Sequence, residues 1–75
     1  MEAFFILEVG MNLKVNGEDY QTLKETVAGL LQEMEIQSGR VAVEVNLKII
    51  KKADYDNARL SEGDVIEIVN FVGGG

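Results

Sequence analysis

The segment Val65–Phe71 limits the possible folds of this chain more than any other stretch of the sequence. It is nearly continuously apolar, and only Glu67 and Asn70 interrupt the run. A strand of this kind is typical of the middle of a sheet, where it pairs with neighbours on both sides. Three glycines, Gly73–Gly75, follow it. The sequence therefore predicts a sheet built around this strand, with a glycine tail that leaves from a firmly held segment.

A β-hairpin is predicted before the rest of the domain. Met11–Val15 alternates apolar and polar residues, which is the pattern of a half-buried strand. Asn16-Gly17 favours a type I′ turn, because both residues tolerate a positive φ. We expect Glu18–Thr22 to return as a short strand, and its acidic residues suit the edge of a sheet.

One amphipathic helix is predicted after the hairpin. Its apolar residues recur at the spacing of a single helix face and are Val27, Leu30, Leu31 and Met34. Glu33 and Glu35 are expected on the solvent side. Thr26 suits the N-cap, although Thr22 begins a segment with capping-box spacing that would start the helix earlier. Gly29 indicates close packing or a short, weak helix, because glycine inside a helix costs about 1 kcal/mol relative to alanine.

The second half of the chain predicts further strands. Arg40–Val45 is β-branched and alternating, and Ile49-Ile50 is expected to form a short strand after a turn. Lys51–Arg59 is polar and irregular, with two expected anchors onto the core, Tyr55 and Leu60. Ser61–Asp64 is a predicted turn before the last strand. A hairpin and later strands around one helix indicate an α+β roll, in which one main helix packs across one face of a mixed sheet of four to five strands.

The composition limits the chemistry that the chain itself can perform. Its 75 residues contain no Cys and no His, so the usual thiolate nucleophile, general base and zinc ligands are missing. The net charge of −6 argues against nucleic acid and anionic membrane as partners, and favours a basic patch on another protein. Residues 1–10 lack the pattern of a signal peptide, and no apolar run is long enough to span a bilayer. We therefore expect a cytoplasmic protein that is no enzyme, with no catalytic residue and no metal site of its own.

Several segments combine with the helix stripe into a more specific pattern: Val15–Glu18, Val41–Asn46, Glu62–Val69 and Val72–Gly75. Together they resemble the ThiS family, the ubiquitin-like sulfur carriers of thiamine biosynthesis. The resemblance covers Met11–Gly75 and implies the β-grasp fold. It divides the chain into an N-terminal extension of open function (1–10), a β-grasp domain (11–72) and a flexible glycine tail (73–75).

The resemblance also implies how the tail is used. Gly75 is the sulfur acceptor, and Gly73 and Gly74 form the slender lead into the active sites of partner enzymes. A ThiF-like activating enzyme uses Mg·ATP to adenylate the Gly75 carboxylate, and a persulfide donor such as a cysteine desulfurase replaces AMP to leave a thiocarboxylate. A ThiG-like thiazole synthase takes the sulfur, and the carrier binds no cofactor. This chemistry needs only an accessible chain end, and the stretch from Val72 to Gly75 extends roughly 14 Å at most.

A docking surface for these partners is predicted beside the tail. Ile66 and Ile68 are expected to face the helix, so the alternate residues of the last strand face away from it. The predicted docking residues are Val69, Phe71, Val72 and Glu67, with Ala42 of the neighbouring strand. Ordinary surface apolarity, or cover by residues 1–10, is the competing interpretation. No role is assigned to the basic residues Lys48, Lys51, Lys52 and Arg59.

Three alternatives share the fold. A small subunit of the molybdopterin-synthase type has the same tail chemistry with a different sulfur acceptor. A ubiquitin-like modifier would instead join Gly75 to lysines of other proteins. A plain interaction module would carry a tail without function, so that deletion of Gly74 and Gly75 would change nothing.

Overall fold

The structure is a computed structural model, and it describes residues 10–71 of the chain. The predictions for the N-terminal extension, for Val72 and for the glycine tail fall on residues 1–9 and 72–75, which lie outside the described residues. The division of the chain into extension, domain and tail therefore stays a prediction.

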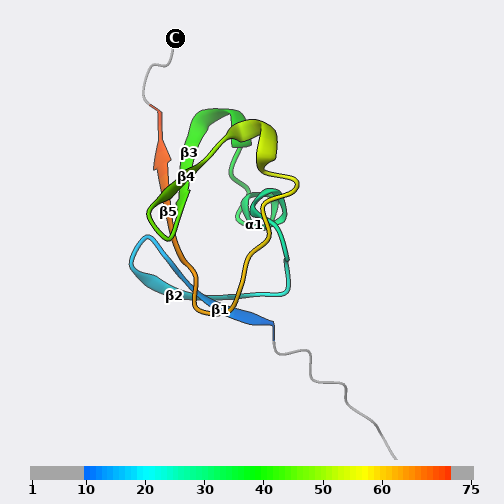
Figure 1. The fold of residues 1–75 in the computed structure, drawn as a ribbon, viewed down its shortest axis with the longest axis vertical. Coiled ribbons are helices and arrows are strands. Elements are labelled where there is room, and N and C mark those ends of the chain that lie inside the picture. The colour runs from blue at the N-terminus through cyan, green and yellow to red at the C-terminus, as the bar shows by residue number, and fades with distance from the viewer. Residues whose placement is uncertain (1–9, 72–75) are drawn as a thin grey trace, which may run out of the picture.

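The chain forms one mixed sheet and one main helix (Figure 1). Its elements in chain order are β1 (Met11–Val15), β2 (Glu18–Thr22), α1 (Val27–Glu33), β3 (Val41–Val45), β4 (Lys48–Ile50) and β5 (Val65–Asn70). Two 3₁₀ turns, Ser38–Arg40 and Lys52–Asp54, flank β3 and β4. The sheet order is β2-β1-β5-β3-β4, and β1 and β5 run parallel while the other pairs are antiparallel. The predicted α+β arrangement and the central place of the last strand are confirmed.

Both hairpins turn through residues with positive φ. Asn16 and Gly17 have φ values of 50° and 84°, as a type I′ turn requires. The second hairpin turns at Asn46 and Leu47, with φ values of 52° and 71°. A branched, apolar residue rarely takes this conformation, and the sequence did not single out Leu47.

The helix α1 begins at Val27, as the Thr26 cap predicts. The Thr26 hydroxyl oxygen accepts a hydrogen bond from the Gly29 amide at 3.1 Å. The earlier start at Thr22 is wrong, because Thr22 ends β2 and its hydroxyl accepts from the Lys24 amide at 2.9 Å. A Cβ on Gly29 would lie 3.3 Å from both the Lys24 Cβ and the Thr26 Oγ1, so close packing accounts for this glycine.

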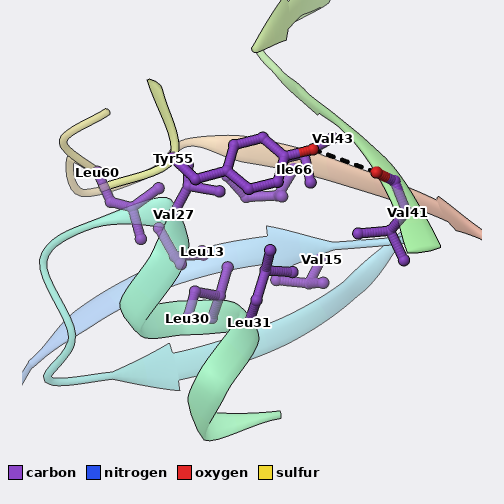
Figure 2. Close-up of a cluster of buried hydrophobic side chains, with 10 residues drawn as sticks. All are labelled: Leu13, Val15, Val27, Leu30, Leu31, Val41, Val43, Tyr55, Leu60 and Ile66. Carbon is purple, nitrogen blue, oxygen red and sulfur yellow. Dashed lines mark hydrogen bonds between the residues drawn. The ribbon is translucent and has the colours of Figure 1, made fainter. Parts of the chain in front are cut away.

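The hydrophobic core lies between α1 and one face of the sheet (Figure 2). Leu30 of α1, Val43 of β3 and Ile66 of β5 are fully buried. The predicted anchors Tyr55 and Leu60 are buried as well, and they bring the segment after β4 onto the core. Figure 2 shows the Tyr55 hydroxyl pointing at the Val41 carbonyl, to which it donates a hydrogen bond at 3.2 Å.

The predicted ends of two strands differ from the structure. Arg40 belongs to the 3₁₀ turn and not to β3, and Phe71 lies just beyond the end of β5. Glu33 is exposed as predicted, but its carboxylate accepts hydrogen bonds from the hydroxyls of Thr22 at 2.6 Å and Tyr20 at 2.9 Å. These bonds hold the pKa of Glu33 below its usual value. They connect the edge strand β2 to the end of α1.

Candidate functional site

The strand β5, which leads into the glycine tail, is held on both sides. It pairs in parallel with β1 at Val65 and Ile66, and antiparallel with β3 from Ile66 to Asn70. On the β3 side, the hydrogen bond farthest along the chain within residues 10–71 runs from the Phe71 amide to the Arg40 carbonyl, at 2.8 Å. Figure 1 shows β5 running out of the sheet towards the C-terminal end of the chain. The tail therefore follows a segment that is fixed up to its last described residue.

Two asparagine side chains complete the pairing of β5 where neighbouring strands end. The Asn16 amide accepts from the Ile68 amide at 2.7 Å and donates to the Ile68 carbonyl at 3.2 Å. The Asn46 side-chain oxygen accepts from the Val65 amide at 2.9 Å. Sequence reasoning used both asparagines only as turn residues. Their side chains also hold β5. The feature of the sequence that could have indicated this role is that each asparagine stands at the first position of a hairpin turn.

The predicted docking residues lie together on the sheet face opposite α1. Ala42 is the register partner of Val69, and both are on the face away from the core. Val69 is 60% exposed and Phe71 is 56% exposed, whereas Ile66 of the same strand is fully buried. Glu67 is half-buried on the same face as Val69. The structure thus brings together the four predicted docking residues that it describes; Val72 lies outside them.

Further apolar residues that the sequence analysis did not include extend this open face. Ile49 of β4 is the register partner of Glu44, which places it on the same face, and it is 73% exposed. Val65 at the start of β5 is also exposed. No periodic pattern within Lys48–Ile50 could have found Ile49, because its face is set by the register between β3 and β4. We call the surface formed by Ala42, Glu44, Ile49, Val65, Glu67, Val69 and Phe71 the open face.

Two ion pairs join charged side chains within the described residues. Lys14 lies beside Val65 in the register, and its ammonium is 2.8 Å from the Asp19 carboxylate. The hydrogen bond and charge of Lys14 hold the pKa of Asp19 below its usual value. In the basic group of the second half, Arg59 pairs with Glu25 at 2.9 Å. Nothing in these contacts assigns a function to the basic group.

Residues 10–71 hold no group of three or more His, Cys, Asp or Glu side chains that could bind a metal ion. They also contain no helix of the length and apolarity needed to cross a membrane.

The sequence matches the ThiS family over residues 11–75. The chain belongs to the ThiS family. It is 43% identical to the sulfur carrier protein ThiS of Bacillus subtilis over 65 residues, which cover 84% of this chain and 98% of that protein. It is also 44% identical over 66 residues to a protein of Paramagnetospirillum magneticum named thiazole synthase. That match covers 87% of this chain but only 20% of the relative.

Solved structures of the family have the same fold. The crystal structure of the thiamine biosynthesis protein ThiS from Geobacter metallireducens matches with a TM-score of 0.75 and 32% identity, covering 87% of this chain and 100% of that one. The NMR structure from the same organism matches with a TM-score of 0.69. The prediction of a β-grasp fold is therefore confirmed.

Proposed function

We propose that this protein is a sulfur carrier of thiamine biosynthesis, which acts in the cytoplasm as a co-substrate of other enzymes and not as an enzyme. The single observation that carries the proposal is the placement of β5. This central strand is hydrogen-bonded up to Phe71, and the sequence after it ends in Gly73–Gly75. Membership of the ThiS family supports the same function.

The first chemical step activates a carboxylate that is otherwise a poor electrophile. A carboxylate oxygen of Gly75 attacks the α-phosphorus of ATP, the bond to pyrophosphate breaks, and an acyl-adenylate forms. A ThiF-like enzyme supplies the Mg·ATP and the catalytic groups. The carrier contributes a slender tail, whose backbone can enter a narrow active site because glycines have no Cβ.

The second step exchanges oxygen for sulfur. The terminal sulfur of a persulfide, provided by a donor such as a cysteine desulfurase, attacks the acyl carbon and AMP leaves. A thiol then cleaves the resulting sulfur–sulfur bond, which leaves the thiocarboxylate on Gly75 and a disulfide on the donor side. Neither step needs a Cys or His on the carrier, which fits a sequence that has neither.

The sulfur acceptor is proposed to be a ThiG-like thiazole synthase. Matches to proteins named thiazole synthase in two organisms, each over 20% of the relative's length, support this partner. The open face supports a shared way of docking, because its exposed apolar residues continue along β5 to the segment before the tail.

Intact-mass spectrometry tests the proposal directly. The carrier is incubated with the ThiF-like enzyme of the same organism, Mg·ATP and a persulfide donor. We expect a mass change equal to one oxygen replaced by sulfur, located at Gly75 by fragmentation. A protein that lacks Gly74 and Gly75 should gain no sulfur and keep its melting temperature. The absence of a mass change, while the Bacillus subtilis carrier is charged by its own enzymes in parallel, would refute the function.

A further inference from the structure

The open face of the sheet carries two carboxylates side by side. Glu44 of β3 and Glu67 of β5 are directly opposed in the ladder, and both residues are half-buried. Directly opposed residues of antiparallel strands have Cβ atoms about 5 Å apart, and like charges at this separation destabilise a sheet. The pair therefore works against the stability of the isolated domain.

No cation neutralises this pair within the part of the chain that the structure describes. The ion pairs there join Lys14 to Asp19 and Arg59 to Glu25, and neither Glu44 nor Glu67 uses its carboxylate in a hydrogen bond. Lys14 lies on the same face as Val65, but its ammonium is already bonded to Asp19. A cation that neutralises the two carboxylates must therefore come from outside this part of the chain.

The surroundings of the pair determine what such a group must be. Ala42 and Val69 flank the carboxylates along the strands, and Ile49 lies opposite Glu44 on β4. A protein that covers these apolar side chains also removes water from the carboxylates. Burying a charge costs free energy unless an opposite charge pairs with it. A partner that docks here must therefore bring a cation.

We propose that the adenylating enzyme places a guanidinium group between Glu44 and Glu67, while its apolar side chains cover Ala42, Val69 and Phe71. A guanidinium presents a planar fork of donors that can engage two carboxylates together. This inference rests on the proposed function and deepens it.

Two observations favour the adenylating enzyme as the occupant. Adenylation brings the anionic chain end against the triphosphate of ATP, so the enzyme surface around that site must be positive for a carrier of net charge −6 to approach. Glu67 also lies on β5, the strand that leads into the tail. An enzyme that holds the tail therefore reaches this pair along the same strand.

The test replaces both glutamates by their neutral isosteres. With the ThiF-like enzyme of the same organism, E44Q/E67Q should lower kcat/KM for pyrophosphate release by about tenfold or more, mainly through KM. The melting temperature of the variant should stay the same or rise, because the repulsion between the strands is removed. This combination separates a docking role from a structural one. The matched control is E18Q/E35Q, which removes the same charge from exposed residues away from the open face and should change kcat/KM less than twofold.

Three outcomes would overturn the inference. An unchanged kcat/KM in E44Q/E67Q would exclude the cation contact. An equal loss of kcat/KM in E18Q/E35Q would show that the effect comes from the net charge of the carrier and not from this pair. A loss of binding to thiazole synthase, with adenylation unaffected, would assign the pair to a different partner. Failure of the proposed function is distinguishable from all three, since in that case the unaltered protein would not be adenylated either.

Discussion

The two faces of the sheet are made by the same strands but differ in how far they are buried. On the face that packs against α1, Val43 and Ile66 are completely removed from water. On the opposite face, Val69 and Phe71 remain more than half exposed, although they are equally apolar. Burial of the first face stabilises the domain. Exposed apolar side chains of the second face gain little from folding, and this is why we propose a docking role for them.

The largest loss of stability should come from a change on the covered face, by which we mean the sheet face that packs against α1 together with the side chains of α1 that cover it. Leu30→Ala removes a fully buried side chain of α1 and should lower the free energy of unfolding by about 2–5 kcal/mol. The matched change on the open face, Val69→Ala, should alter it by less than about 0.5 kcal/mol. Urea unfolding of both variants measures the contrast. Comparable losses would mean that the open face also contributes to the fold.

Phe71→Asp should show the reverse pattern. Its side chain is exposed, and its backbone amide keeps the hydrogen bond to Arg40, so the melting temperature should stay unchanged. The carboxylate would be buried without a partner in the docked complex, and kcat/KM for adenylation should fall by about tenfold, equivalent to 1.4 kcal/mol. Phe71→Leu serves as the control that keeps the apolar contact. Unchanged kinetics in Phe71→Asp would remove Phe71 from the docking surface.

A smaller effect is expected at the start of α1. Thr26→Ala removes the hydroxyl that caps the Gly29 amide and should cost about 1 kcal/mol of stability. Thr26→Ser keeps the hydroxyl and should restore most of the loss. Adenylation kinetics below the melting temperature should not change in either variant, because the cap belongs to the covered face. A kinetic defect in Thr26→Ala would show that the two faces are coupled.

The smallest effect concerns pH. The pKa of Glu33 is lowered in the folded protein by the Thr22 and Tyr20 hydroxyls, so the ionised carboxylate binds these donors better than the protonated acid does. This contribution is complete above the unfolded pKa of about 4.3 and is lost as the pH falls through the lower folded value. Glu33→Gln should therefore flatten the stability profile in that acidic range. Urea titrations at several pH values measure it, and an identical acid limb would contradict the assignment.

Sequence patterns predicted the fold in most of its parts. Alternation and the Asn16-Gly17 turn identified the first hairpin, and the apolar run at Val65–Phe71 correctly indicated the central strand. The helix stripe was also correct, but two caps with similar chemistry left its start open. Only the fold could decide between them, because Thr22 was required at the end of β2. Arg40 is a similar case: the sequence pattern does not distinguish the end of a 3₁₀ turn from the start of a strand at this position.

The candidate site was predicted less completely. Period-two alternation placed Glu67, Val69 and Phe71 on one face, and the structure confirms that placement. Ile49 was missed because its membership depends on the register between β3 and β4, which a three-residue strand does not reveal. The opposition of Glu44 and Glu67 likewise depends on the register between β3 and β5. Their docking roles remain predictions.

The side chain of Asn16 has a mechanical consequence for the end of the chain. It stands in for a peptide group of β1 and binds both backbone groups of Ile68, and within residues 10–71 no hydrogen bond from the β1 side reaches farther along β5. A pulling force on the C-terminal end would open the contacts to β3 one after another, beginning at Phe71, and meet its first two-sided resistance at Ile68. Each residue released in this way lengthens the lead by about 3.5 Å. The Asn16 amide therefore marks the point along β5 beyond which the strand is held from the β3 side alone within residues 10–71.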